Sequence, residues 1–353
     1  MNSSRTEVFP SEVSGLVDEA ALRAWMDARG RGRGPLRDVR VLTGGTQNVL
    51  LRFRRDDKDY VLRRGPRHLR SSTNDHLRKE MRVLAALAGT NVPHPALLEA
   101  CPAEDVLGGS VFYLMEPIDG DNPTISLPDS YEQPALRHRL GLSVVEALAA
   151  LGAVDHRAVG LGDLGYPDGF LERQVPQWLR HLESYAAFDG YPAGSLPHVE
   201  SVAGWLERHR PATFVPGILH GDFHLANVLV DDAGEVLAVV DWEMTTIGDP
   251  LLDLGWLLAT WPEPGRPDIL DSVIGAAGGL PSQFEVVEHY AARSQRDLSH
   301  VDWYVTLACF KLGIVLEGTH ARACAGLAPG QTGERLRDAA RVLLSRAAEL
   351  AGA

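Results

Sequence analysis

Short apolar runs separated by turn residues dominate the first third of the chain. Residues 49–54 and 59–64 each contain a short apolar run, on either side of Asp56-Asp57-Lys58, which predicts two strands joined by a tight turn. Apolar residues then recur at helical spacing over residues 72–88, and an amphipathic stretch over residues 13–29 predicts a leading helix. Further strands are predicted over residues 38–43, 96–101 and 111–115.

Helical periodicity takes over beyond residue 120. Helices are predicted over residues 133–154, 170–187, 198–210, 250–261, 284–293, 301–322 and 333–351. One hairpin interrupts them, with strands at residues 228–230 and 236–240 around the turn Asp231-Asp232-Ala233-Gly234. We therefore expect an α+β protein with a small β-rich lobe over residues 1–117 and a larger, mostly α-helical lobe over residues 118–353.

The composition is that of a globular protein long enough for two lobes, with 353 residues of which 45% are hydrophobic and 23% charged. A net charge of −13 would repel phosphate backbones, so we expect no nucleic-acid partner. No run approaches the roughly 20 apolar residues that span a bilayer, so we expect no membrane partner. The cysteines are few and widely spaced (Cys101, Cys309 and Cys324), which favours a reducing compartment, and we expect a cytoplasmic location.

The sharpest polar residues flank the predicted hairpin. Asp222 and Asn227 lie on the loop that enters it, and Asp241 lies at its exit. Because a hairpin returns its two ends to the same place, three oxygen-bearing side chains are expected to converge. Phosphoryl transfer needs such a set: an acid that accepts a hydroxyl proton, and hard oxygen ligands for magnesium.

The order His220-x-Asp222-x-x-x-x-Asn227, a short hairpin and then Asp241 resembles the catalytic segment of the protein-kinase-like superfamily. The resemblance implies the bilobal kinase-like fold, with ATP as co-substrate and Mg²⁺ as cofactor. It implies that Asp222 is the catalytic base, that Asn227 and Asp241 hold the metal, and that His220 supports the loop.

The same resemblance assigns nucleotide contacts to the first lobe. Arg63 stands where kinases carry a phosphate-binding lysine, and Glu80 on the following helix is its expected partner; the alternative is an arginine on an exposed strand edge. The segment that takes the place of the glycine-rich loop contributes Gly45, Thr46 and Asn48. The connector between the lobes contributes Met115 behind the adenine, with the Glu116 carbonyl and the Ile118 amide at the adenine edge.

Two departures argue against a protein kinase. Gly221 replaces the arginine that reads an activation-loop phosphate, and Trp242-Glu243 replaces Phe-Gly. The segment from Asp241 to residue 250 is also too short for an activation loop, as in small-molecule kinases.

The tract from residue 220 to 261 is similar to the aminoglycoside phosphotransferase and choline kinase family, most of all to the branch also found fused to acyl-CoA dehydrogenases. The matching motifs extend over residues 38–327. The resemblance implies that Asp249 and Asp253 brace the catalytic loop; both are also suited to capping a helix.

The acceptor is the part that the motifs leave open. Candidates to line its site are Trp178, Trp242, Glu243, Trp303, Tyr304 and His320. Aminoglycosides require a dense group of carboxylates, and no acidic run is present, so a hydroxylated lipid, an acyl thioester, a sugar or a small alcohol all stay open. The oligomeric state and the choice between ATP and GTP stay open too.

Two other classes of function compete with a kinase. One is a nucleotide-binding regulatory module, which the complete set of Asp222, Asn227 and Asp241 argues against. The other is a metal-dependent hydrolase that uses His220, Asp222 and His224, which leaves Arg63 unexplained.

Overall fold

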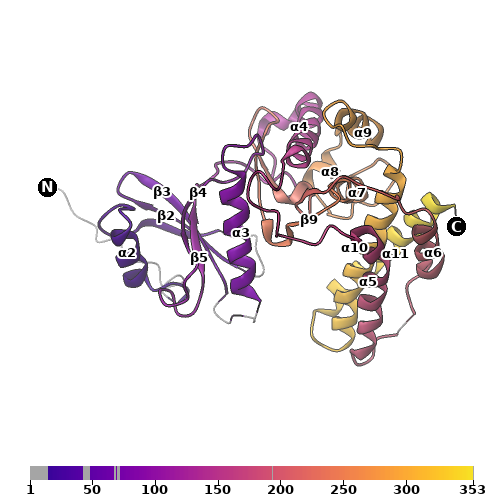
Figure 1. The fold of residues 1–353 in the computed structure, drawn as a ribbon, viewed down its shortest axis with the longest axis horizontal. Coiled ribbons are helices and arrows are strands. Elements are labelled where there is room, and N and C mark those ends of the chain that lie inside the picture. The colour runs from indigo at the N-terminus through magenta and orange to yellow at the C-terminus, as the bar shows by residue number, and fades with distance from the viewer. Residues whose placement is uncertain (1–14, 43–47, 67–68, 70–71, 193, 353) are drawn as a thin grey trace. The chain divides into compact units, whose positions relative to one another are not determined.

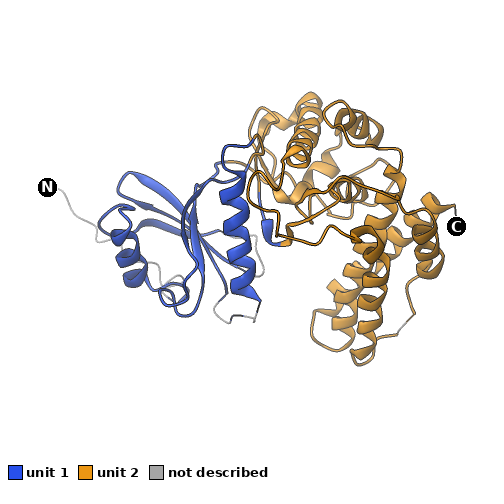
Figure 2. Cartoon of the chain, in the orientation of Figure 1, with its two compact units in different colours: residues 1–90, 94–119, 240–243 blue, residues 91–93, 120–239, 244–353 orange. Residues whose placement is uncertain are grey.

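The computed structural model describes residues 15–42, 48–66, 69, 72–192 and 194–352. The chain forms two compact units, which are coloured separately in Figure 2. Unit 1 contains residues 1–90, 94–119 and 240–243, and unit 2 contains residues 91–93, 120–239 and 244–353. From the sequence we expected a single boundary at residue 117. The main difference is that the short segment 240–243, although it lies in the second half of the chain, belongs to unit 1.

Unit 1 is built on one antiparallel sheet of five strands in the order β1-β2-β3-β5-β4. Each strand expected from the sequence is present, with ends that shift by at most two residues. The strands are β1 (Arg37–Val41), β2 (Val49–Arg55), β3 (Lys58–Arg64), β4 (Leu97–Cys101) and β5 (Phe112–Met115).

Two helices cover opposite faces of this sheet, α2 (Glu19–Ala28) and α3 (Thr73–Leu87), as Figure 1 shows. Strand alternation decides which side chains meet which helix. Leu62 faces α2 and joins a hydrophobic core with Trp25 and Met26. Arg63 and its register partner Tyr113 therefore point to the other face, toward α3.

Unit 2 is mostly helical and confirms the seven helices predicted there. They are α4 (Pro134–Ala153), α5 (Phe170–Ser184), α6 (Val199–Arg208), α7 (Leu251–Ala259), α9 (Gln283–Ala291), α10 (Val301–Cys324) and α11 (Gly330–Ala351). The short α8 (Val273–Ala277) was not predicted. Every residue of α7 is buried, so this helix is enclosed on all sides. No helix in the described ranges is apolar over a length that could cross a bilayer.

Two small strand pairs hold the polar loop of unit 2. The predicted hairpin is confirmed as β7 (Val228–Val230) and β8 (Val236–Val239). A second pair, β6 (Gly217–Leu219) with β9 (Thr246–Gly248), was missed, because three-residue strands show no measurable alternation. Since β9 continues into α7, the pairing returns α7 to the loop that follows β6.

Close contact between α7 and α10 depends on a glycine. A Cβ atom on Gly255 would lie 2.5 Å from the backbone oxygen of Tyr304, where nothing flexible can give way. We predict that Gly255→Ala lowers the free energy of unfolding by about 1–3 kcal/mol, the usual cost of overpacking, measured by urea denaturation.

Gly204→Ala in α6 is the matched control. A Cβ atom there meets only the end of the flexible Arg208 side chain, at 3.1 Å. This substitution should leave stability unchanged or raise it by up to about 1 kcal/mol, because alanine is the better helix former. Equal losses in the two variants would contradict the packing explanation.

Candidate active site

The centre of the polar site in unit 1 is the guanidinium of Arg63 on β3. Its Nε donates to Glu80 Oε2 at 2.9 Å and its Nη2 to Glu80 Oε1 at 2.6 Å, a two-pronged ion pair between β3 and α3. Tyr113 donates its hydroxyl to Glu80 Oε2 at 3.0 Å. Arg63 is 9% exposed, so the interpretation as a surface strand-edge arginine is wrong.

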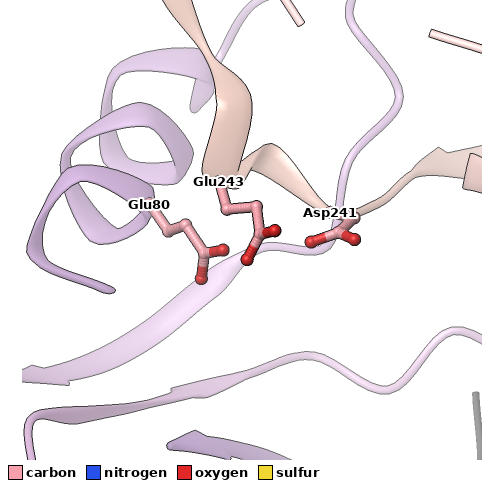
Figure 3. A group of neighbouring side chains, drawn as sticks. All are labelled: Glu80, Asp241 and Glu243. Atoms are coloured by element: carbon pink, nitrogen blue, oxygen red, sulfur yellow. The ribbon is translucent and has the colours of Figure 1, made fainter. Parts of the chain in front are cut away.

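Two further carboxylates reach Arg63 from the segment that follows β8. Arg63 Nη2 donates to Asp241 Oδ1 at 2.8 Å, and Glu243 Oε2 lies 3.9 Å away. Figure 3 shows the carboxylates of Glu80, Asp241 and Glu243 turned toward one another. One oxygen from each lies within 4.8 Å of the others, which is close enough to share a cation.

Electrostatics favour a permanently charged group at the centre of this cluster. Burial opposes the charge on Arg63, but the carboxylates of Glu80 and Asp241 hold the pKa of Arg63 above its ordinary value. Asp241 has φ +67°, a left-handed backbone that aspartate tolerates better than most side chains. The carboxylate is therefore presented to Arg63 from an unfavourable backbone conformation, as is common at functional sites.

The remaining nucleotide candidates lie around the same sheet. Gly45 and Thr46 fall outside the described residues. Asn48 immediately precedes β2, and Met115 is the last residue of β5. The Glu116 amide donates to the Ala96 carbonyl at 2.9 Å, which fixes the start of the segment that carries Ile118.

In unit 2 the Asp222 carboxylate is held by three side-chain contacts. Trp256 Nε1 donates to Oδ1 at 2.9 Å, and His224 Nε2 lies 3.1 Å from the same oxygen. Asn227 Nδ2 donates to Oδ2 at 3.2 Å and to the Asp222 backbone oxygen at 2.9 Å. The Asp222 side chain is still 36% exposed, so it is held in position and reaches solvent.

These contacts keep Asp222 ionised. Burial alone would raise its pKa, but the neighbouring His224 and His220 rings and the hydrogen bond from Trp256 outweigh it. Together they lower the pKa of Asp222 to about 2. Asp222 is therefore a negatively charged acceptor at every ordinary pH.

Asp253 braces the loop that carries Asp222. From the first turn of α7 it accepts backbone N–H groups from His220 at 2.6 Å and Gly221 at 2.9 Å. Burial raises the pKa of Asp253 to about 7, against the opposing effects of these hydrogen bonds and of Lys311. Asp249 accepts the Leu251 amide at 3.1 Å and the Tyr304 hydroxyl, and burial raises its pKa as well.

The glycine after His220 is required by the loop. Gly221 has φ +88°, and a Cβ atom there would lie 2.6 Å from the Met244 backbone oxygen. This explains why the arginine of protein kinases is absent at this position: no side chain fits between the loop and residue 244.

The residues expected to line an acceptor site lie in different surroundings. Trp242 is buried, and Glu243 joins Arg63 in unit 1. Tyr304 is buried with its hydroxyl on Asp249. His320 is buried, with its Nε2 3.6 Å from Cys324 Sγ.

Trp256, which donates directly to Asp222, was not among the site residues predicted from the sequence. The spacing in the sequence could have indicated this contact. Trp256 follows Asp253 by three residues, so the two residues lie on the same face of α7. Trp178, which was predicted, lies on α5 with its ring near the ammonium of Lys311, another residue that was missed.

Comparison with known proteins decides the family. The profile of the phosphotransferase enzyme family, APH, matches residues 38–293, most of the chain. The chain belongs to this family. Membership identifies it as a kinase-like phosphotransferase, and its α+β fold is the bilobal protein-kinase-like fold.

Relatives of known sequence and structure agree with this assignment. Acyl-CoA dehydrogenase family member 11 of Rattus norvegicus is 29% identical over 328 residues, which are 91% of this chain and 41% of that protein. The chain thus spans well under half the length of the curated relatives it matches. A Ralstonia eutropha JMP134 protein, assigned to the aminoglycoside phosphotransferases, is 29% identical with TM-score 0.78, covering 94% of this chain and 99% of that one.

A more distant neighbour shares the fold. A thermostable mutant of the aminoglycoside phosphotransferase APH(4)-Ia, solved with AMP-PNP and hygromycin B, has TM-score 0.62 at 16% identity. The comparison covers 91% of this chain and 98% of that one.

The buried pair in unit 1 makes a direct prediction about stability. Glu80→Ala leaves Arg63 partly unpaired inside the protein, so we expect a loss of about 3–5 kcal/mol in the free energy of unfolding. Glu104→Ala removes the partner of Arg78 in an exposed pair of the same unit, and should cost less than about 1 kcal/mol. Chemical denaturation of both variants measures the difference, and equal costs would show that burial does not matter here.

Proposed function

We propose that Asp222 is the catalytic base of this phosphotransferase. The observation that carries the proposal is the Asp222 carboxylate itself: ionised, held by Trp256, His224 and Asn227, and partly open to solvent. In the reaction the acceptor hydroxyl donates a hydrogen bond to Asp222 while its oxygen attacks the γ-phosphorus of ATP. The bond from the γ-phosphorus to the bridging oxygen breaks, ADP leaves, and the hydroxyl proton passes to Asp222.

The low pKa of Asp222 determines when the proton moves. A carboxylate with a pKa of about 2 is a weak base, so it cannot take a proton from an ordinary alcohol. It orients the hydroxyl first and accepts the proton late, once the oxygen has bonded to phosphorus and become acidic. Positioning therefore supplies more of the acceleration than basicity does.

We propose Asn227 and Asp241 as the magnesium ligands, and their donor atoms fit that ion. Both hydrogen bonds of the Asn227 side chain are made by its nitrogen, which leaves the amide oxygen for a cation. Asp241 uses Oδ1 for Arg63 and retains Oδ2, on a side chain that is 41% exposed. Magnesium prefers such oxygen ligands, and when bound it neutralises charge on the ATP phosphates.

Register supports the pairing of these two ligands. Val228 and Val239 are register partners in the hairpin. Asn227 is the residue before Val228, and Asp241 comes two residues after Val239.

We also propose that Arg63 contacts the ATP phosphates. Its Nη2 already serves Glu80 and Asp241, so the pair with Glu80 orients the guanidinium and keeps it charged. With Nε and Nη2 occupied, the two N–H groups of Nη1 are the donors that we propose for phosphate oxygens. The Glu116 carbonyl and the Ile118 amide are proposed for the adenine edge.

The two rival functions have less support. A hydrolase built on His220, Asp222 and His224 needs ring nitrogens that are open to a metal. His220 and His224 each use Nδ1 to accept a backbone N–H, from Asp222 and Ala226 respectively, and the His224 proton on Nε2 then faces Asp222. A regulatory module would not need Asp222 to be both ordered and exposed. The cytoplasmic location and the oligomeric state stay predictions or open points.

The proposal is tested by separating catalysis from nucleotide binding. Asp222→Asn keeps the shape but removes the charge, and we expect kcat to fall by about 10²–10⁴-fold, the usual contribution of a general base. ATP affinity with magnesium, measured by calorimetry, should stay unchanged. The assay is ADP release with a panel of aminoglycosides, choline, sugars and hydroxyacyl-CoA thioesters.

Asp232→Asn is the matched control, an exposed aspartate in the turn of the same hairpin. It should leave both kcat and ATP affinity unchanged. Full activity in the Asp222→Asn variant would overturn the assignment of the base.

A further inference from the structure

Lys311 on α10 is a cation that contacts two aromatic rings but no acceptor among the residues that the structure describes. The sequence contains only two other lysines, Lys58 and Lys79. The Lys311 ammonium lies 5.4 Å from the ring centres of both Trp178 and Trp256, and it makes no hydrogen bond or ion pair with any residue that the structure describes. The residue is largely enclosed but keeps some exposure to solvent.

An enclosed ammonium without an acceptor is costly. Two indole faces attract a cation, but they cannot replace the hydrogen bonds that water gave to its three N–H groups. Burial accordingly lowers the pKa of Lys311 to about 8, although the charges of Asp253 and Asp222 oppose this. The ammonium is still mostly charged at neutral pH, and an anion that reached it would regain the missing hydrogen bonds.

The position of Lys311 connects it with the catalytic residue. Trp256 contacts the Lys311 ammonium with its ring and donates its Nε1 proton to Asp222 Oδ1 at 2.9 Å. Both charged side chains are partly exposed, and both belong to unit 2. One small molecule can therefore place a hydroxyl group at Asp222 and a second polar group at Lys311.

We propose that Lys311 binds a negatively charged group of the acceptor, a carboxylate or a phosphate, whose hydroxyl group is held by Asp222. This inference rests on the function proposed above and specifies the substrate class of the same site. The acceptor is then a hydroxy acid or the phosphate ester of a polyol. Aminoglycosides and choline are cations, and Lys311 would repel their charged groups.

The first test asks whether anions reach Lys311 without relying on turnover. The full chain is methylated with formaldehyde and a mild reductant at pH 8, and peptide mass spectrometry measures the rate at each of Lys58, Lys79 and Lys311. The probes are short hydroxycarboxylates, glycerol phosphate, neutral glycerol and choline. We expect the carboxylates, the phosphate or both to slow modification of Lys311 by about tenfold or more, while glycerol, choline and the rate at Lys58 show no such effect.

The outcomes of this test are decisive in both directions. Protection by carboxylates alone or by phosphate alone supports the proposal and names the anion. Equal modification of Lys311 with every probe overturns it. Failure to modify Lys311 even with so small a reagent also overturns it, because the ammonium would then be closed to any acceptor.

The second test uses the acceptor that supports ADP release. Lys311→Met preserves the length of the side chain and removes the charge, so KM for an anionic acceptor should rise about 10- to 100-fold, as for a lost charge-assisted hydrogen bond. KM for ATP should stay constant, and Lys311→Arg should recover part of the loss. The control is Lys58→Met, at an exposed position at the start of β3.

These results separate the inference from the proposed function. A purely structural lysine would change KM for ATP, or the melting temperature, together with KM for the acceptor. If Asp222→Asn stays active while anions still protect Lys311, the assignment of the base fails and the anion site stands. If Asp222→Asn is inactive while Lys311→Met leaves KM for the acceptor unchanged, the base stands and this inference fails.

Discussion

The interaction on which the site in unit 1 depends is the buried ion pair between Arg63 and Glu80. It joins β3 to α3, and the same Nη2 atom of Arg63 holds Asp241, which lies 178 residues later in the chain. Without that charge, Glu80, Asp241 and Glu243 would repel one another inside 4.8 Å. Arg63 therefore has two functions: it permits three acids to meet, and it presents a permanent positive charge where we propose that ATP phosphates bind.

Unit 2 uses a different solution for Asp222, the acid that we propose as the catalytic base. Asp222 is stabilised chiefly by hydrogen bonds from Trp256, Asn227 and His224 rather than by a permanent cation, and Asp253 fixes the loop through backbone N–H groups. This difference suits the two roles that we propose. An acid that must receive a substrate hydroxyl has to stay open on one side, whereas a fully paired carboxylate would have no capacity left for the substrate.

Local patterns allowed most of the fold to be predicted and singled out the candidate residues of the site. Asp222, Asn227 and Asp241 could be singled out as candidates because they flank one short hairpin, Val228–Val239. Contacts made across long sequence separations were harder to predict. Glu243 was expected near the acceptor but pairs with Arg63, and Tyr304 turned out to be a buried partner of Asp249, because only tertiary packing decides which face of a segment is enclosed. Lys311 carried no motif of its own and became visible only between two indole rings.

The measurement that tests the central claim most directly is ³¹P NMR of the γ-phosphoryl group of ATP during turnover with magnesium and the acceptor panel. The account predicts that the γ-phosphate signal is replaced by that of an organic phosphomonoester together with ADP, and that Asp222→Asn stops this conversion while ATP still binds. Release of inorganic phosphate alone, at a rate that Asp222→Asn does not change, would contradict the account, since it would mean that water is the acceptor and that Asp222 has no part in the transfer.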